Sequence, residues 1–352
     1  MADRSDDIRA AVERARAAGT PLYIRGGDSK RGMLGRDCTA QPLDVAGHCG
    51  IVDYQPAELY LTARAGTPLA EIETLLAEQQ QTLPCESPQL GTATLGGTLA
   101  CNLSGPARPW AGSIRDLAMG VQLVNGRGEL LTFGGKVIKN VAGYDVTRLQ
   151  AGALGTLGVI TELTVKVLPR PEHSLTLVYD MDAAPALATM NRRAGESAPL
   201  TGACWLADRL YLRLAGAASA VTQTAANWGG EQHPGEHSIW QEVREMRLSC
   251  FDGSEPLWRV SLSSTAPPME DPAPVLIDWC GAQRWVRGDH DREALQAHAA
   301  AAGGHVSLFR GGDRSSEVRP PLSSLEQNLQ RRLKQSFDPD GLFNPGRLYS
   351  WM

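Results

Sequence analysis

The sequence predicts an α+β fold in two domains with a tail, in which short strands alternate with amphipathic helices. The chain has 352 residues, of which 42% are hydrophobic and 21% charged, and this is enough for more than one buried core. Some segments alternate polar and apolar residues as half-buried strands do, and others repeat apolar residues every three or four positions as helices do. The alternating run at residues 161–168 ends at Pro169-Arg170-Pro171, and we place the domain boundary there.

The first domain is predicted over residues 1–171. Its charged start leads into an N-capped amphipathic helix around residues 8–13 and lacks the apolar middle of a signal peptide. A short strand at residues 20–24 then precedes a loop that contains two glycines. A strand and a turn at residues 58–68 are followed by a helix whose apolar positions are Leu69, Ile72, Leu75 and Leu76.

A β-hairpin is predicted over residues 119–133 of this first domain. Two strand-like runs flank Asn125-Gly126, a pair that favours a tight turn between antiparallel strands. The alternating strand at residues 161–168 then completes the domain.

The second domain is predicted over residues 172–320, with a smaller mixture of strands and helices. Residues 263–274 carry four prolines and predict a solvent-exposed loop. A C-terminal segment, residues 321–352, begins with a helix at residues 325–337 and turns at residues 338–341. The predicted strands of the second domain are 175–178, 210–214, 258–262 and 275–279, and its predicted helices are 183–195, 216–227 and 291–302.

Composition argues against several classes of protein. A net charge of −5 and an aromatic content of 6% provide neither the basic surface nor the stacking platforms of a nucleic-acid binder. No apolar run reaches the roughly 18 residues that a spanning helix needs, so we expect membrane contact only through a partner. Seven widely spaced cysteines without a Cys-x-x-Cys pair indicate reduced thiols in the cytoplasm.

Three glycine-rich segments are the strongest functional signal. The loop at residues 25–30 combines flexible backbone amides with a hydroxyl and two cations, which suits a pyrophosphate, although a solvated surface turn is the alternative interpretation. The second segment, residues 93–105, has adjacent glycines and little charge, and the third contains Gly152, Gly155 and Gly158. Neither Gly-x-Gly-x-x-Gly nor a Walker loop occurs, which disfavours a Rossmann or P-loop protein. The sequence therefore predicts a long anionic ligand held at several points.

Seven motifs follow one another along the chain: Arg25-Gly26-Gly27 with Ser29, Ala65-Gly66-Thr67-Pro68-Leu69, Thr94-Leu95-Gly96-Gly97, Gly112-Ser113-Ile114-Arg115-Asp116, Asn140-Val141-Ala142-Gly143-Tyr144-Asp145, residues 155–161, and Asn344-Pro345-Gly346. Their order resembles the FAD-linked oxidases of the vanillyl-alcohol oxidase type, and within them the FAD-binding subunits of bacterial glycolate oxidases. The resemblance covers residues 1–171 and the tail. It implies a two-lobed PCMH-type FAD-binding domain at 1–171, a smaller α+β cap domain at 172–320, and a C-terminal helix and tail at 321–352 that return to the flavin.

The resemblance also implies that FAD is the cofactor. Binding is expected to be non-covalent, because the first loop offers Asp28 where relatives with covalent FAD use a histidine or cysteine, although Cys101 lies near the second segment. Residues 25–30 and 91–97 would hold the pyrophosphate, and the others would line the ribityl chain and flavin. The residues so assigned are Arg25, Gly26, Gly27, Asp28, Ser29, Lys30, Gly91, Thr92, Thr94, Leu95, Gly96, Gly97, Asn102, Gly105, Ser113, Gly158, Val159, Ile160 and Asn344.

The activity that the resemblance implies is oxidation of glycolate, a 2-hydroxy acid, to glyoxylate by a multi-subunit oxidase. Electrons would pass to an iron–sulfur subunit and then to quinone, and a larger FAD subunit would be a further partner. We expect a cytoplasmic chain, or one held at the inner face of the cell membrane through the complex. Two alternatives stay open: a non-catalytic FAD-binding subunit for electron transfer or architecture, and a stand-alone FAD oxidase for a sugar lactone or alcohol.

The sequence identifies neither catalytic residues nor a metal site. His305, Arg310 and Arg347 are candidates for a base and a carboxylate-binding cation, and the alternative is a strand-end histidine with two solvated arginines. His233 and His237 are four residues apart, but Pro234-Gly235 lies between them and prevents a shared helix face.

Overall fold

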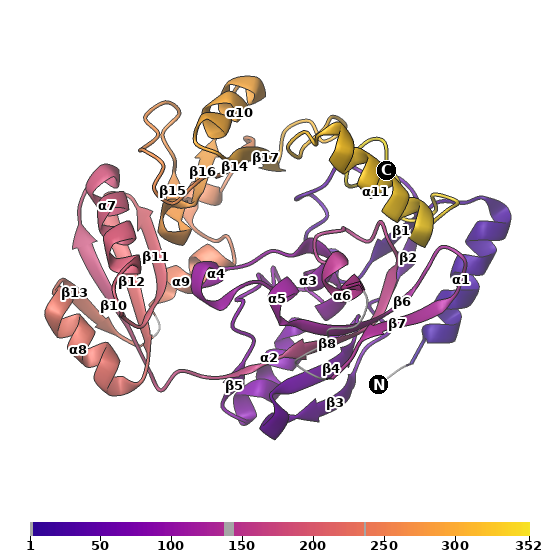
Figure 1. Ribbon diagram of the computed structural model, residues 1–352, viewed down its shortest axis with the longest axis horizontal. Coiled ribbons are helices and arrows are strands. Elements are labelled where there is room, and N and C mark those ends of the chain that lie inside the picture. Colours follow the sequence, from indigo (N-terminus) through magenta and orange to yellow (C-terminus); the bar gives the residue numbers. More distant parts are fainter. Residues whose placement is uncertain (1–2, 137–143, 236) are drawn as a thin grey trace. The chain divides into compact units, whose positions relative to one another are not determined.

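The computed structural model describes residues 3–136, 144–235 and 237–352, and the chain divides into two compact units (Figure 1). Unit 1 comprises Met1–Leu103, Ser113–Pro169 and Asp313–Met352, and unit 2 comprises Ser104–Gly112 and Arg170–Gly312. The structure thus changes unit next to the boundary predicted after residue 171. It differs from the predicted limits in placing Ser104–Gly112 with unit 2 and the tail with unit 1.

Unit 1 is built around a five-stranded antiparallel sheet in the order β3-β4-β8-β6-β7. Two smaller sheets belong to the same unit, because β1 pairs in parallel with β2 and β5 pairs in antiparallel with β9. The strands are β1 (Leu22–Arg25), β2 (Gln41–Asp44), β3 (Ile51–Gln55), β4 (Tyr60–Arg64), β5 (Gln81–Thr82), β6 (Ala118–Val124), β7 (Leu130–Gly134), β8 (Val159–Lys166) and β9 (Leu168–Pro169). The helices are α1 (Ser5–Ala18), η1 (Pro56–Glu58), α2 (Leu69–Glu78), α3 (Leu95–Cys101), α5 (Ile114–Leu117), α6 (Val146–Leu149) and α11 (Ser324–Phe337).

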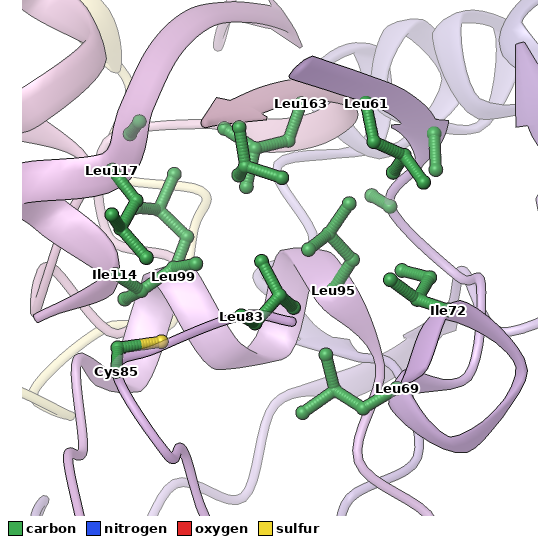
Figure 2. Close-up of a cluster of buried hydrophobic side chains, with 14 of the residues drawn as sticks. Leu61, Leu69, Ile72, Leu83, Cys85, Leu95, Leu99, Ile114, Leu117 and Leu163 are labelled. Atoms are coloured by element: carbon green, nitrogen blue, oxygen red, sulfur yellow. The ribbon is translucent and has the colours of Figure 1, made fainter. Parts of the chain in front are cut away.

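The largest core of unit 1 lies between this sheet and the helices α2, α3 and α5. Leu95 and Leu99, one turn apart on α3, are fully buried with Leu61 of β4 and Leu163 of β8 (Figure 2). Burying each such leucine contributes about 1.5–3 kcal/mol. The apolar face of α3 is therefore held against the sheet, and this orients the opposite face of the same helix.

A second core joins the two ends of the chain. Ile8 and Val12, on one face of α1, pack with Leu22 of β1, Val124 of β6 and Phe343 of the tail. Leu22 and Phe343 also form a parallel β-bridge, so the tail extends the small β1-β2 sheet. The predicted N-terminal helix is confirmed, although its N-cap residue, Arg4, makes no side-chain capping hydrogen bond, and the tail is an integral part of unit 1.

The predicted hairpin is confirmed as β6 paired with β7, but its turn differs from the prediction. Residues 125–129 form a longer connection in which Gly128 adopts a φ of 82°. The buried Asn125 accepts hydrogen bonds at its side-chain oxygen from the amides of Arg127 and Glu129. Gly126 instead donates its amide to the carbonyl of Phe337 in the C-terminal segment. Contact with the tail, rather than a two-residue turn, therefore shapes this connection.

His48 predicts a pH dependence of the stability of unit 1. Its Nδ1 lies 2.9 Å from the amide of Arg4, and its Nε2 lies 2.9 Å from the carbonyl oxygen of Thr161. A neutral ring with the proton on Nε2 satisfies both atoms, and burial lowers the pKa of His48 below its usual value of 6.5.

Because the pKa of His48 is lower in the folded than in the unfolded chain, the unfolded chain binds the proton first as the pH falls. The contribution of neutral His48 is complete above about pH 6.5 and is lost progressively below that value. We expect urea denaturation between pH 5 and 8 to show this loss in the wild type and a flatter profile in His48→Gln. Equal pH profiles of the two proteins would contradict the assignment of this stability loss to His48.

Unit 2 contains an eight-stranded antiparallel sheet in the order β13-β10-β12-β11-β15-β16-β14-β17. The strands and helices predicted for this domain are confirmed, whereas the strands at Leu200–Leu206, Glu231–Pro234, Gln283–Arg287 and His305–Arg310 and the helix at Ser238–Arg244 were not predicted. The strands are β10 (His173–Asp180), β11 (Leu200–Leu206), β12 (Arg209–Gly216), β13 (Glu231–Pro234), β14 (Leu257–Ser261), β15 (Leu276–Asp278), β16 (Gln283–Arg287) and β17 (His305–Arg310). The helices are α4 (Arg108–Ala111), α7 (Ala183–Ala194), α8 (Ala218–Trp228), α9 (Ser238–Arg244), η2 (Ser249–Phe251), η3 (Trp279–Gly281) and α10 (Arg292–Ala301). Over the described ranges, no helix is both long and apolar enough to cross a membrane.

Tertiary contacts explain why Ser104–Gly112 belongs to unit 2. The indole nitrogen of Trp279 donates a hydrogen bond of 3.0 Å to the carbonyl of Gly105, and Trp110 packs against the hydrophobic core of unit 2. Both contacts join residues far apart in the sequence, so no local sequence pattern predicts them.

The segment at 263–274 forms no regular structure and is largely exposed, as its prolines predict, but it also makes buried contacts. Ala266 and Met269 are buried, and the fully buried guanidinium of Arg284 donates to the carbonyls of Ala266, Pro267 and Gly281. One arginine of β16 thus provides hydrogen-bond donors for backbone carbonyls of a connection that forms no regular structure of its own.

Replacing Arg284 with methionine should destabilise unit 2 by about 2–4 kcal/mol, because buried carbonyls lose their donor. Urea denaturation followed by tryptophan fluorescence measures this loss. Arg192→Met on the exposed face of α7 is the control and should change stability by less than about 0.5 kcal/mol. A small effect at both positions would show that water replaces the guanidinium.

Candidate cofactor-binding site

A cleft lies within unit 1, and the space between its walls, open solvent included, is about 750 Å³. Its wall combines the end of β1 and the following loop, one face of α3, the segment before β8, and the C-terminal tail. The predicted cofactor-binding residues that line it are Arg25, Gly26, Gly27, Asp28, Ser29, Lys30, Thr94, Gly96, Gly97, Gly158, Ile160 and Asn344.

The loop at 25–30 owes its position to its two glycines. A Cβ added to Gly27 would lie 1.5 Å from the carbonyl oxygen of Thr92, and one added to Gly26 would lie 2.3 Å from the hydroxyl oxygen of Thr94. The hydroxyl of Thr92 also donates a 2.6 Å hydrogen bond to the carbonyl of Gly27. The loop is thereby held against the segment that leads into α3, which is possible only without side chains at these two positions.

Backbone amides of the same loop face no protein acceptor. Across the described ranges, the amides of Gly27, Asp28 and Ser29 make no hydrogen bond to another residue. Asp28 adopts a φ of 53°, a conformation found in anion-binding nests of successive amides. These donors fit the diphosphate of FAD, and the loop therefore meets the chemistry that such a group requires.

The amides of the adjacent glycines of α3 are occupied within the protein. The amide of Gly96 donates to the carbonyl of Ala65, and that of Gly97 donates to the side chain of Thr94, which caps the helix. A Cβ added to Gly96 would approach the Cβ of Ala65 to 2.6 Å. These glycines therefore permit close packing and shape the wall of the cleft, instead of presenting free amides to a ligand.

Charge in the cleft is predominantly positive. The carboxylate of Asp28 accepts a 2.7 Å hydrogen bond from the hydroxyl of Tyr23 and lies 3.6 Å from Arg31. Arg25 pairs with Asp44 at 3.2 Å. Lys30 lies in the wall, 7% exposed, with its ammonium 3.3 Å from the hydroxyl of Ser29.

Asn344 connects three parts of the wall. Its side-chain oxygen accepts a hydrogen bond from the amide of Ile24 at 2.7 Å, and its side-chain nitrogen donates to the carbonyl of Leu154 at 2.6 Å. A Cβ on Gly155 would approach that nitrogen to 2.8 Å. Asn344 therefore lines the cleft, and its amide group also holds β1 and residues 154–155 together.

Seven predicted residues lie outside the cleft wall. Leu95 and Val159 are fully buried in hydrophobic cores, and Ser113 forms a capping box with Asp116 at the start of α5. Gly105 belongs to unit 2, where its carbonyl accepts the hydrogen bond from Trp279. The remaining three are Gly91, Thr92 and Asn102.

These last three residues have local structural roles. Thr92 positions the loop at 25–30, as described above. Gly91 has a φ of 86°, and Asn102 ends α3 in a left-handed conformation with a φ of 50°. Of the resemblance motif at residues 140–145, residues 140–143 lie outside the described residues.

Several cleft residues were not among the predicted binding residues. Ala100 and Cys101 follow Gly96 and Gly97 by one helical turn, so the helical period of 95–101 is the signal that would have found them. Arg347 was expected to be solvated if it had no function, but it is 5% exposed and lines the cleft. The others are Tyr23, Ile24, Arg31, Val45, Ala65, Ala93, Leu154 and Gly155.

The other candidates for chemistry lie in unit 2. His305 is exposed at the start of β17, and Arg310 donates to the carbonyl of Phe251. The rings of His233 and His237 lie 5.0 Å apart, but Nδ1 of His237 accepts the amide of Ile239 at the start of α9. That ring nitrogen is therefore occupied within the protein.

Comparison of the sequence with known proteins identifies the family of this chain. The protein-family model described as "FAD binding domain" matches residues 1–134 of this chain. Glycolate oxidase subunit GlcE of Escherichia coli K12 is 44% identical over 349 residues, which is 99% of this chain and 98% of that protein. Glycolate oxidase subunit GlcD of Bacillus subtilis is 36% identical over 129 residues, 35% of this chain and 27% of that protein.

Among solved structures, an alkyldihydroxyacetonephosphate synthase matches with a TM-score of 0.65 and 16% identity, covering 97% of this chain and 75% of that one. At this identity the match supports the fold alone, and it agrees with the predicted α+β fold of the FAD-linked oxidases. The chain therefore carries an FAD-binding domain and belongs to the family of glycolate oxidase subunit GlcE.

Proposed function

We propose that this chain is the FAD-binding subunit of a multi-subunit glycolate oxidase, which oxidises glycolate to glyoxylate and passes the electrons to an iron–sulfur subunit and on to quinone. The end-to-end match to GlcE, 99% of one chain with 98% of the other, carries the proposal. A larger FAD subunit and the iron–sulfur subunit are its partners, and through them the chain is held at the inner face of the cell membrane.

Non-covalent FAD in the cleft of unit 1 is part of this proposal. The amides of residues 27–29 would bind the diphosphate, Lys30 would contribute positive charge, and Gly96, Gly97, Gly158 and Ile160 would admit the remainder of the cofactor. Bound FAD would supply the two-electron acceptor that oxidation of a 2-hydroxy acid requires.

A second candidate function is an FAD-binding subunit that transfers electrons or supports a larger homologous catalytic subunit. It is favoured by the state of the cleft's titratable groups. Burial raises the pKa values of Tyr23 and Cys101, so both keep their protons at neutral pH, and the carboxylate of Asp28 is held by Tyr23 and Arg31. A base for the substrate hydroxyl would then come from outside this set.

One experiment separates these functions. The chain is purified alone and with its co-expressed partner subunits, and flavin absorbance is recorded anaerobically before and after glycolate is added. Bleaching in the isolated chain supports catalysis by this chain, whereas bleaching in the complex alone supports the second function. The proposal would be overturned by an isolated chain without flavin together with a complex that holds no more flavin than the larger FAD subunit accounts for. Flavin that stays with acid-precipitated protein would overturn non-covalent binding.

A further inference from the structure

Arg347 is a buried cation in the wall of the cleft. It follows Asn344-Pro345-Gly346 in the tail and is 5% exposed. Its Nη2 donates to the carbonyl of Arg31 at 2.6 Å and to that of Met33 at 3.3 Å, and its Nη1 donates to the carbonyl of Arg36. The guanidinium therefore joins the tail to residues 31–36, which continue directly from the loop at 25–30.

The partners of Arg347 leave its charge uncompensated. Arg25 and Arg31 of the same wall each pair with an aspartate, whereas the contacts of Arg347 within the described chain are to neutral carbonyls. Burying a cation in this way is costly unless an anion approaches it. The charge of Arg347 also acts on another residue of the cleft, Cys101. Burial raises the pKa of the Cys101 thiol, and the positive charges of Lys30 and Arg347 oppose that rise.

We propose that Arg347 binds the diphosphate of FAD and so couples cofactor binding to docking of the C-terminal tail. The inference rests on the proposed binding of FAD in this cleft. A guanidinium suits a phosphate oxygen because its N–H groups form a planar fork and its charge persists when buried. Its contacts with residues 31–36 place it beside the loop whose free amides fit the same anion.

Arg36 provides a matched control. Its guanidinium also bonds to three neutral carbonyls, those of Gly346, Ser315 and Ser316, and so joins the same segment to the tail from the other side. It does not belong to the described wall of the cleft. A purely structural role of the arginines would therefore appear in variants at either position, whereas a role in binding the diphosphate would appear only at Arg347.

The test measures dissociation constants of FAD and riboflavin for the full chain freed of flavin, because riboflavin lacks the diphosphate. We expect Arg347→Gln to weaken FAD binding roughly 10- to 100-fold, the range for loss of a charged hydrogen bond, and to leave riboflavin binding unchanged. Arg347→Lys and Arg36→Gln should stay within about 3-fold of the wild type for FAD, because each keeps a cation at position 347. The FAD affinity of Arg347→Gln should also depend less on salt.

Three results would overturn the inference: unchanged FAD affinity in Arg347→Gln, a parallel loss of FAD and riboflavin in Arg347→Gln and Arg36→Gln, or unchanged FAD affinity with a raised KM for glycolate. The third would assign Arg347 to the substrate carboxylate. If the wild type binds neither flavin, the proposed function fails and this inference fails with it.

A measurement on the wild type keeps the inference testable if Arg347→Gln does not fold. Hydrogen exchange of residues 338–352 should slow with FAD and with inorganic diphosphate, but not with riboflavin. Equal protection by riboflavin, or no protection by FAD, would overturn the coupling between the tail and the diphosphate.

Discussion

Replacing Gly27 with alanine should abolish retention of FAD by this protein. The new Cβ would lie 1.5 Å from the carbonyl oxygen of Thr92, a backbone atom that cannot move aside as a flexible side chain would. The loop at 25–30 must then leave the segment before α3, and its free amides move with it. We expect FAD affinity to fall by at least about 100-fold and stability by about 1–3 kcal/mol, the usual cost of overpacking.

Gly32→Ala is the matched control for this variant. Gly32 lies just beyond the same loop, and a Cβ added there would meet nothing within 4 Å. Equilibrium dialysis with FAD and thermal unfolding should show Gly32→Ala close to the wild type. If Gly27→Ala retains FAD as well as this control does, the loop does not depend on close contact with residue 92.

Replacing Lys334 with methionine should destabilise unit 1 by about 3–5 kcal/mol, the cost of breaking a buried ion pair from one side. The ammonium of Lys334 lies 2.6 Å from the carboxylate of Asp338 and also donates to the carbonyls of Thr156 and Phe343. Asp338 is 1% exposed and accepts the amides of Leu342 and Phe343. The variant would leave this carboxylate buried without its cation.

The loss should extend to the cofactor, because the tail that follows Asp338 contributes Asn344 and Arg347 to the cleft. Urea denaturation and FAD titration measure the two effects on the same preparation. Arg332→Met, an exposed position on the same helix, should change neither. A loss of stability with unchanged FAD affinity would show that the tail stays docked without the ion pair.

Local patterns in the sequence predicted about half of the helices and strands of unit 1 and the loop that begins its cleft. The alternation at 161–168 appears as β8, and the apolar repeat that begins at Leu69 appears as α2. The glycines of residues 25–30 were recognised because flexible amides beside cations are a local signal. All six residues of this loop line the cleft.

Residues whose roles depend on distant partners were harder to predict. In the sequence Lys334 lies near the end of a helix, where a cation complements the helix dipole, yet its ammonium donates to the carbonyl of Thr156, a residue 178 positions away. Gly96 and Gly97 were expected to help hold a pyrophosphate, and only the structure shows that their amides donate to Ala65 and Thr94. Strands such as β11 and β16 belong to a sheet that is formed by pairing between segments distant in the sequence. A short stretch of sequence does not contain that information.

The sequence by itself determined that the chain is an α+β protein with a glycine-rich site for an anionic cofactor, because helical period, strand alternation and glycine loops each involve neighbours a few residues apart. Only the tertiary structure decided which face of α3 lines the cleft, that Ser104–Gly112 belongs to unit 2, and that Arg347 reaches Arg31 across 316 positions. Such contacts form when packing brings distant segments together, and the burial of a charge depends on that packing rather than on the residues beside it in the chain.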